Sequence, residues 1–407
     1  MITVPLHGAR VLPVALCLVI SACATPSATS PSQSESESRA PQTSAAPPLA
    51  VSAAPAFYHP SADAVANAAP GEIIRAVEIR APSGMRAWTV LYGSIGLDGQ
   101  PVAVSGIILA PAGAPSARGY PVVAWAHGTT GIADRCAPSR SGVAGVPMEA
   151  VVAAGYVVTA TDYEGLGTDG THPYLIGVSE GRSVLDSIRA AKNLPEAHAA
   201  DETVVMGLSQ GGHSALWAAQ LAPTYAPELD LRGALAASPP ADMSSLLDWT
   251  VHSAAAGQIY TAMAPMLLFG VWSETYGLPL PFLTDRGRRI AATVASGCDS
   301  GLEADPYASN PTLDAQWSRR LVENSPGAAR TDVPILVVAP SDDQLVSYES
   351  QVAGVVAMCA IGDTVELRTV SGGHDAFFFS AAGLQAAQDW IAARIAGEPA
   401  TSTCAPV

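Results

Sequence analysis

The stretch that decides the fold is Thr203-Val204-Val205-Met206-Gly207-Leu208-Ser209-Gln210-Gly211, which runs on into Gly212-His213-Ser214-Ala215-Leu216-Trp217-Ala218. Its first part is short and apolar and predicts a buried strand, whereas the part after Ser209 predicts a helix. Ser209 has a glycine two residues before it and another two residues after it. Glycines at these positions remove the side chains that would clash when a serine is held on a tight strand-to-helix turn. The stretch therefore predicts a nucleophile elbow with Ser209 at its tip.

Similar short apolar segments recur along the chain and alternate with longer amphipathic ones. The expected strands are residues 122–126, 156–161, 203–208, 233–237, 335–339 and 364–370, and the expected helices are residues 148–154, 182–193, 210–221, 350–360 and 381–396. Continuous apolar strands separated by helices indicate a parallel sheet covered on both faces. Strand-like residues 75–80, 86–92 and 102–110, separated by turn signals, predict an antiparallel start. We therefore expect an α/β fold whose mostly parallel sheet is flanked by helices.

One interval interrupts this alternation. Residues 239–331 separate two successive expected strands, and an unstructured loop of that length is improbable inside a compact domain. The interval contains helix-like segments at residues 259–272 and 287–294. We expect it to form a helical cap, or lid, inserted between two parts of the core, residues 56–238 and 332–407. The apolar and aromatic residues 263–272 are expected to line an acyl pocket.

The N-terminal region predicts export. Arg10 precedes an apolar run of the length of a signal-peptide core, which is too short to span a bilayer as a helix. The run ends in Ile20-Ser21-Ala22-Cys23, which resembles a lipobox, so residues 1–23 are expected to be a signal peptide with Cys23 as the acylated residue. The alternative is an ordinary cleavage site with an incidental cysteine. Residues 24–55 are rich in Ser, Pro and Ala and predict a disordered tether, or a disordered leader without a particular role.

Charge and cysteine content limit the classes of partner. The formal net charge is −16, which argues against binding to nucleic acid or electrostatic adhesion to anionic lipid. Outside the signal region lie Cys136, Cys298, Cys359 and Cys404, and none has metal-ligand spacing. In an exported protein four cysteines suggest two disulfides, for which the sequence permits three pairings, with free buried thiols as the alternative. We expect neither a metal nor a cofactor.

A second pentapeptide of the same form, Gly177-Val178-Ser179-Glu180-Gly181, shows that the motif alone is weak. Ser179 follows a turn-like segment rather than a buried strand. Glu180 would also place a carboxylate where an oxyanion-binding amide is needed. We therefore interpret Ser179 as the N-cap of the helix expected at residues 182–193 and keep Ser209 as the nucleophile.

A nucleophilic serine needs a base, and the base needs an acid to orient it. The expected strand at residues 335–339 is followed by Ser341-Asp342-Asp343, and the last expected strand is followed by Ser371-Gly372-Gly373-His374. His374 is therefore the expected general base. Asp343 is the preferred acid and Asp342 the second choice, with the other aspartate capping the loop. We interpret His198, His213 and His252 as structural or exposed.

An oxyanion hole should combine the backbone N–H of Gln210 with one from the loop Ala126-His127-Gly128-Thr129-Thr130-Gly131. The amides of Thr129 or Thr130 are the candidates, and their hydroxyls could add a donor. We expect His127 to hold this loop rather than to act in catalysis.

These runs, together with Cys136-Ala137-Pro138-Ser139 and the segment from Thr161-Asp162-Tyr163-Glu164-Gly165 to His172-Pro173-Tyr174, resemble the secretory lipase family of fungi and actinobacteria. The resemblance extends over nearly everything from Tyr58 to Cys404. It implies a capped α/β-hydrolase fold with a triad of Ser209, Asp343 and His374. It also implies disulfides between Cys136 and Cys298 and between Cys359 and Cys404. The chain departs from the family at Pro340, where the family usually has glycine.

The function expected from the residues and the resemblance is hydrolysis of acylglycerols or simpler acyl esters through an acyl-enzyme, without a cofactor. A lipid or small-molecule ester would be the substrate, and a lipid anchor at Cys23 could hold the enzyme at a membrane. The alternatives are a peptidase or acyltransferase with the same triad, or a catalytically dead surface-binding scaffold.

Overall fold

The computed structural model describes residues 49–145, 147–255, 263–294, 297–298 and 307–405. The expected signal peptide, Cys23 and most of the expected tether lie outside these residues. The chain divides into the units Met1–Pro47 and Pro48–Val407, and every element below belongs to the second. The folded region begins earlier than the expected residue 56. The carbonyl oxygen of Ala50 accepts a hydrogen bond from Arg80 N at 2.7 Å, which attaches the end of the expected tether to the fold.

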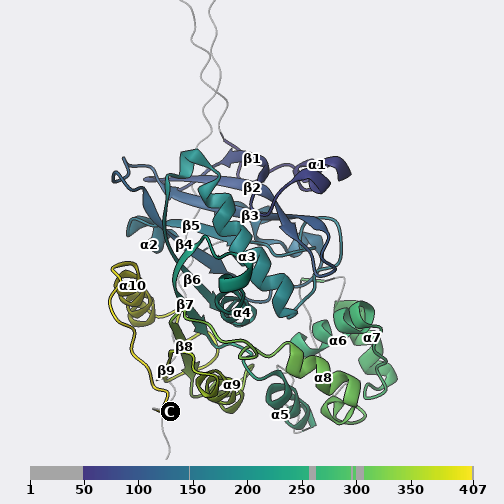
Figure 1. Cartoon of the computed structure of the whole chain (residues 1–407). Coiled ribbons are helices and arrows are strands. Elements are labelled where there is room, and N and C mark those ends of the chain that lie inside the picture. Colours follow the sequence, from purple (N-terminus) through teal and green to yellow (C-terminus); the bar gives the residue numbers. More distant parts are fainter. Residues whose placement is uncertain (1–48, 146, 256–262, 295–296, 299–306, 406–407) are drawn as a thin grey trace, which may run out of the picture. The chain divides into compact units, whose positions relative to one another are not determined.

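Among the described residues, nine strands form one sheet in the order β1-β2-β3-β5-β4-β6-β7-β8-β9 (Figure 1). The pairs β1/β2, β2/β3 and β3/β5 are antiparallel, and every pair from β5 to β9 is parallel. The carboxyl ends of the parallel strands therefore meet at one edge of the sheet, where ligands bind in open α/β folds. The strands are β1 (Ile73–Ile79), β2 (Met85–Ile95), β3 (Pro101–Pro111), β4 (Tyr120–Ala126), β5 (Val157–Thr161), β6 (Ala199–Leu208), β7 (Asp230–Ala237), β8 (Ile335–Pro340) and β9 (Val365–Val370).

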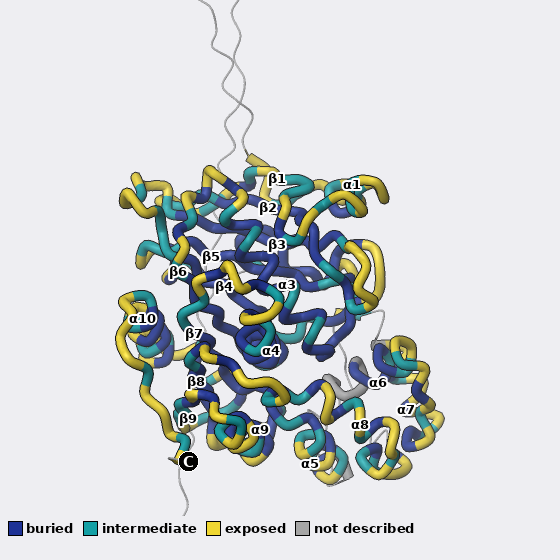
Figure 2. Tube along the Cα trace, in the orientation of Figure 1, coloured by how far each residue is buried: buried dark blue, intermediate teal, exposed yellow. Residues whose placement is uncertain are grey.

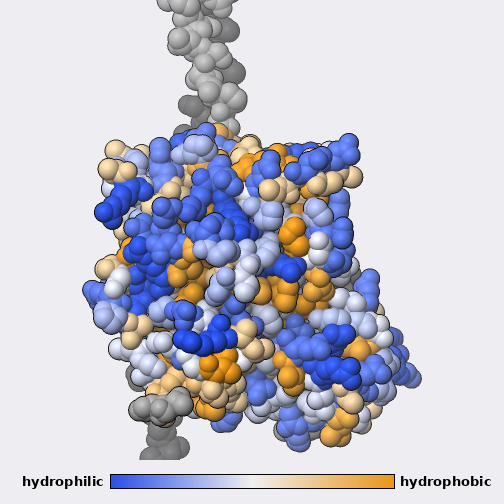
Figure 3. Space-filling model, in the orientation of Figure 1, coloured by the Kyte–Doolittle hydropathy of each residue, from blue (hydrophilic) through white to orange (hydrophobic). Residues whose placement is uncertain are grey.

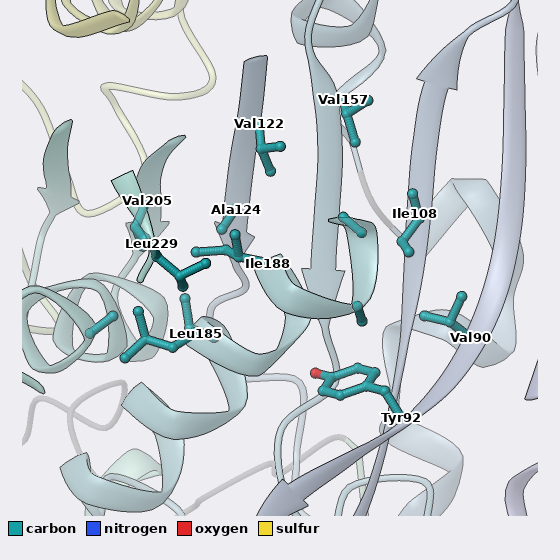
Figure 4. Close-up of a cluster of buried hydrophobic side chains, with 14 of the residues drawn as sticks. Val90, Tyr92, Ile108, Val122, Ala124, Val157, Leu185, Ile188, Val205 and Leu229 are labelled. Atoms are coloured by element: carbon teal, nitrogen blue, oxygen red, sulfur yellow. The ribbon is translucent and has the colours of Figure 1, made fainter. Parts of the chain in front are cut away.

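Helices cover both faces of the sheet, and the central strands are largely buried (Figure 2). Alternate residues of these strands pack on opposite faces. α2 (Glu149–Ala153) and α10 (Ala381–Ile395) pack on one face with Val123 and Met206. On the other face α3 (Gly177–Lys192), α4 (Gln210–Tyr225) and α9 (Tyr348–Ala360) cover Val122, Val205 and Val337. Figure 4 shows Leu185 and Ile188 of α3 beside the strand residues of this second face. The expected two-sided α/β architecture is confirmed.

The insertion between β7 and β8 is helical. It contains α5 (Met243–Ala255), α6 (Met263–Tyr276), α7 (Asp285–Val294) and α8 (Ala315–Glu323), which lie together beside the sheet in Figure 1. Aromatic rings form its core, with Trp272 and Trp317 stacked 6.1 Å apart and Phe269 against both Phe282 and Trp317. α6 and α7 correspond to the expected helices, whereas α5 and α8 were not expected. α8 buries Trp317 and Leu321 among charged residues, which is too narrow an apolar stripe to stand out in the sequence.

The remaining short elements are α1 (Ala62–Asn67) and the 3-10 helices η1 (Pro55–Tyr58), η2 (Asp134–Cys136), η3 (Pro138–Gly145), η4 (Pro195–Ala197) and η6 (Pro311–Leu313). The face of the molecule in Figure 3 is mostly hydrophilic, with hydrophobic residues in separate patches. Among the residues described, none of the helices combines the length and the apolar character needed to cross a bilayer.

Candidate active site

Ser209 lies on the turn between β6 and α4, as expected. Its φ is 58° and its ψ is −118°, a conformation that a residue with a side chain rarely adopts. Its backbone N–H donates to Ala237 O at 2.9 Å. The two flanking glycines are required by close approach, because a Cβ at Gly207 would lie 2.1 Å from Gly211 O and a Cβ at Gly211 would lie 1.8 Å from Ala126 O. The elbow spacing in the sequence thus has a direct steric cause.

His374 and Asp343 are brought together from the loops after β9 and β8. His374 Nδ1 lies 3.0 Å from Asp343 Oδ1 and 2.9 Å from Oδ2, and both side chains are buried. Asp343 also accepts hydrogen bonds from the backbone N–H groups of Leu345 and Val346, each at 2.9 Å. Because Nδ1 faces a carboxylate, Nε2 is the ring nitrogen of His374 that remains for a contact with another group. The loop is held from β7, where Ser238 Oγ donates to His374 O at 2.7 Å.

Asp342 takes a different position from its neighbour. It is exposed, and its Oδ2 accepts hydrogen bonds from Ser341 Oγ at 3.0 Å and from Gly372 N at 3.2 Å. These are the contacts of a carboxylate that caps a loop. The structure therefore places Asp343, and not Asp342, against His374.

The expected oxyanion loop lies next to the elbow because β4 pairs with β6, with Ala126 opposite Gly207. Gln210 is buried at the first position of α4, where backbone N–H groups have no partner inside the helix. Thr129 Oγ1 is 2.8 Å from Tyr174 Oη, so its hydroxyl is already engaged. Thr130 Oγ1 is buried and has no hydrogen-bond partner among the residues that the structure describes.

His127 is held within its loop. Its Nδ1 donates to Gly128 O at 2.7 Å, its carbonyl oxygen accepts from Tyr163 Oη at 2.9 Å, and its ring lies 4.5 Å from that of Tyr163. Burial lowers the pKa of His127 below its usual value. These contacts favour the expected supporting role, although the residue also borders the pocket.

One pocket of about 430 Å³ brings these groups together with the cap, a volume in the range of small-molecule sites. Ser209, Gln210, His374, Thr129 and Thr130 all line it. Its other lining residues are largely apolar and include Leu246 and Leu247 of α5, Leu268 of α6, Leu321 of α8, Leu175, Leu345 and Phe379. Leu268 belongs to the segment 263–272 that is expected to line an acyl pocket, and α5 also contributes Met243 and Thr250 to the lining.

The second pentapeptide is part of α3, and Ser179 is not an N-cap. The helix begins at Gly177 with Ile176 as its N-cap, so Ser179 lies inside the first turn, where its hydroxyl donates to the Glu164 carboxylate. The glycines of this motif also allow a close approach, because a Cβ at Gly177 would lie 2.0 Å from the Trp217 ring of α4. The sequence predicts too late a start for this helix, because glycine and serine are weak helix formers. The glycines are explained by close packing against α4, which local sequence does not reveal.

The structure contains both disulfides that the family resemblance implies. Cys136 pairs with Cys298, which lies in the inserted segment, and Cys359 pairs with Cys404 near the C-terminal end. The described residues include no cluster of His, Cys, Asp or Glu able to hold a metal ion. The other histidines lie as interpreted, with His213 buried and His198 and His252 exposed.

Several residues at the site were not expected from the sequence. Tyr174 reaches the oxyanion loop through Thr129, and its carbonyl oxygen accepts from Trp272 of the cap at 2.9 Å. Phe379, which is 76% exposed, borders the pocket. The sequence signal that could have pointed to Tyr174 is the His172-Pro173-Tyr174 run, which is one of the runs on which the family resemblance rests. Phe379 has no comparable signal.

The chain is similar to known lipases over part or most of its length. The family model described as secretory lipase matches residues 143–277. Lipase 6 of Candida albicans is 25% identical over 386 residues, which cover 83% of this chain and 80% of that protein. A Mycobacterium tuberculosis protein named probable inactive lipase is 29% identical over 207 residues, but the match spans only 46% of this chain and 45% of that protein.

Among solved structures, Candida antarctica lipase A in its closed state superposes with a TM-score of 0.71. The match covers 88% of this chain and 90% of that one at 18% identity, so it shows a shared fold. Residues 143–277 thus resemble the secretory lipase family, and the chain shares the α/β-hydrolase fold of lipase A.

Proposed function

We propose that this protein is a serine carboxylic ester hydrolase in which Ser209 is the nucleophile, His374 the general base and Asp343 the acid. The observation that carries the proposal is the pair of contacts between His374 Nδ1 and the Asp343 carboxylate, with His374 lining the same pocket as the strained Ser209. A serine hydroxyl becomes nucleophilic when a neighbouring histidine, oriented by a carboxylate, removes its proton.

The reaction follows from these roles. His374 Nε2 takes the proton of Ser209 Oγ as the oxygen attacks the ester carbonyl. The N–H groups of Gln210 and of Thr129 or Thr130 stabilise the oxyanion. The alcohol leaves with the proton from His374, and the acyl group stays on Ser209. Water, deprotonated in turn by His374, then attacks the acyl-enzyme. The bond between the acyl carbon and Ser209 Oγ breaks, His374 returns the proton to Ser209, and the carboxylic acid is released.

The substrate class follows from the pocket. Leucine side chains of α5, α6 and α8 offer an apolar chain a place to be buried, whereas few polar groups are present to recognise a peptide backbone. Acylglycerols or simpler acyl esters fit this wall better than peptides do.

The test is hydrolysis of p-nitrophenyl acetate, butyrate and palmitate by the wild type and by Ser209→Ala, with a peptide p-nitroanilide as the competing substrate. We expect ester turnover by the wild type and a loss of at least about 10³-fold in kcat for Ser209→Ala. Ester turnover by Ser209→Ala at the wild-type rate would overturn the mechanism. A folded wild type that turns over no ester would instead favour an inactive scaffold, as named for the M. tuberculosis relative.

We also infer that the protein is exported and acylated at Cys23, which rests on the apolar run and the Ile20-Ser21-Ala22-Cys23 site. The two disulfides are consistent with an oxidising compartment. Mass spectrometry of the mature N-terminus tests this. A mature chain that begins at Cys23 and carries the mass of attached acyl chains is expected, and a chain without them would refute acylation.

A further inference from the structure

Glu180, from the second pentapeptide, is a buried carboxylate that the proposed reaction does not use. Its side chain is 0% exposed, and it accepts four hydrogen bonds. These come from Leu175 N at 2.9 Å, Gln210 Nε2 at 2.8 Å, His213 Nδ1 at 2.9 Å and Ser214 Oγ at 2.9 Å. Three of the four donors belong to the first turns of α4, directly after Ser209.

Glu180 is paired with His213, and both ring nitrogens of His213 face acceptors. Nδ1 lies 2.9 Å from Glu180 Oε2, and Nε2 lies 2.8 Å from Asn324 O. Burial on its own opposes ionisation of Glu180, but the donors from His213 and Gln210 outweigh it and hold the pKa of the carboxyl below its usual value. Such a pair is costly to bury and is retained only when its hydrogen bonds are complete. Here each carboxylate oxygen accepts two.

The side chain of Gln210 is fixed on two sides by this arrangement. Its Nε2 donates to Glu180 Oε1 and also to His172 Nε2 at 2.9 Å. His172 Nδ1 in turn donates to Glu164 O at 2.9 Å. Gln210 is the residue whose backbone N–H the proposed reaction places at the oxyanion. The orientation of the Gln210 side chain therefore depends on Glu180.

Glu180 holds the pocket wall as well. Leu175 lines the pocket and has a φ of 55°, which is strained for a residue with a branched side chain. Its backbone N–H is one of the four donors to Glu180. The carboxylate can reach all these groups because Gly177 and Gly181 bring α3 close to Trp217 and Leu221 of α4.

We propose that Glu180 is a positioning residue for the oxyanion hole, acting through Gln210 and Leu175, and that the second pentapeptide serves this purpose. The inference rests on the proposed function. Small errors in the position of an oxyanion donor weaken stabilisation of the transition state more than binding of the substrate, so the loss should fall on kcat.

The experiment compares Glu180→Ala, Glu180→Gln and Gln210→Ala, with Asp186→Ala as the matched control. Asp186 is also a fully buried carboxylate of α3, but it bonds to Ser94, Arg189 and Tyr225, away from the elbow. The readouts are kcat and KM for p-nitrophenyl butyrate, the inhibition constant of an alkyl trifluoromethyl ketone, which forms a tetrahedral adduct with the serine, and the melting temperature.

We expect Glu180→Ala to lower kcat about 10²-fold and to weaken the ketone in parallel, with KM changed less than about threefold. Gln210→Ala leaves the hydrogen bonds from His213 and Ser214 to Glu180 in place, and it should lower kcat about tenfold. Glu180→Gln should recover most of the activity, because its amide can donate to a neutral His213 while its oxygen still accepts from Leu175 and Gln210. Asp186→Ala should lower the melting temperature and leave kcat within about threefold.

If Glu180→Ala does not fold, Gln210→Ala decides. Wild-type kcat and ketone affinity in folded Gln210→Ala or Glu180→Ala would overturn the inference. So would an equal loss of kcat in Asp186→Ala. Any of these results, together with an inactive Ser209→Ala, would leave the proposed function standing, whereas an active Ser209→Ala would remove both.

Discussion

At the scale of single residues, the site contains backbone conformations that residues other than glycine rarely adopt. Ser209, Leu175 and Ser238 all have positive φ without being glycine, and each lies at or beside the pocket. Ser238 uses its position to hold His374 through a hydrogen bond to its carbonyl oxygen. Backbone strain of this kind persists where many surrounding contacts fix the conformation, which is common at sites that hold reacting groups in place.

The neighbouring aspartates provide a matched test at this scale. In Asp343→Asn the amide oxygen can keep the donors Leu345 N and Val346 N, which leaves the amide N–H to face His374 Nδ1 and favours the tautomer in which Nε2 carries the proton. We expect kcat for p-nitrophenyl butyrate to fall by about 10²- to 10⁴-fold. Asp342→Asn, on the exposed side of the same loop, should stay within about threefold of the wild type. Equal losses in the two variants, at unchanged melting temperature, would contradict the assignment of Asp343.

At the scale of elements, the cap supplies much of the apolar wall, and the loops after the strands supply the proposed catalytic residues. α5 and α8 reach the pocket with Leu246 and Leu321, and α8 is tied to the elbow helix where Asn324 O accepts from His213. Preference for acyl length should therefore depend on cap residues, while the rate on short esters should depend on the loops after the strands.

Leu246→Trp tests this division. Leu246 is half-buried at the pocket, so a larger side chain should fill the apolar space without disrupting the cap core. We expect turnover of p-nitrophenyl palmitate to fall at least about tenfold, with turnover of the acetate within about threefold. Val322→Trp is the control, because Val322 is 62% exposed on α8. An equal loss on both esters would argue against an acyl site beside α5.

At the scale of the whole molecule, stability depends on groups that stay uncharged in the interior. Burial lowers the pKa of His172 to about 4, against its ordinary 6.5. Between these values the unfolded chain takes up a proton that the folded protein does not. Acidification therefore destabilises the fold through this window, and below about pH 4 this residue adds no further loss. Burial raises the pKa of Asp162 and of Glu164, and these groups act in the opposite direction.

We therefore predict a difference between the wild type and His172→Gln. From pH 7 to pH 5, His172 should cost the wild type about 2 kcal/mol of its free energy of unfolding, and the variant should be spared this loss. Urea denaturation at pH 7, 6 and 5, followed by circular dichroism, measures it. Parallel losses in the two proteins would show that His172 takes up its proton equally well in the folded state.

Local sequence by itself determined the elements around Ser209. The apolar strand, the two glycines and the helix that follows act over a few residues, so their spacing is sufficient to predict the elbow. The order of the loops that contain Asp343 and His374 was also readable, because parallel strands send their carboxyl ends to one edge. The same local signals predict too late a start for α3, and they do not predict α5 or α8.

Tertiary structure alone decided which aspartate lies against His374, which cap helices line the pocket, and what Glu180 does. Each of these depends on contacts between segments far apart in the chain, such as Glu180 with Gln210 or His213 with Asn324. In the sequence, Gly177-Val178-Ser179-Glu180-Gly181 and the Ser209 elbow have the same form. The first pentapeptide packs inside a helix against α4, whereas the Ser209 elbow follows a strand at the open edge of the sheet. Packing also decides that Glu180 is a buried carboxylate with four donors and not a carboxylate exposed to solvent.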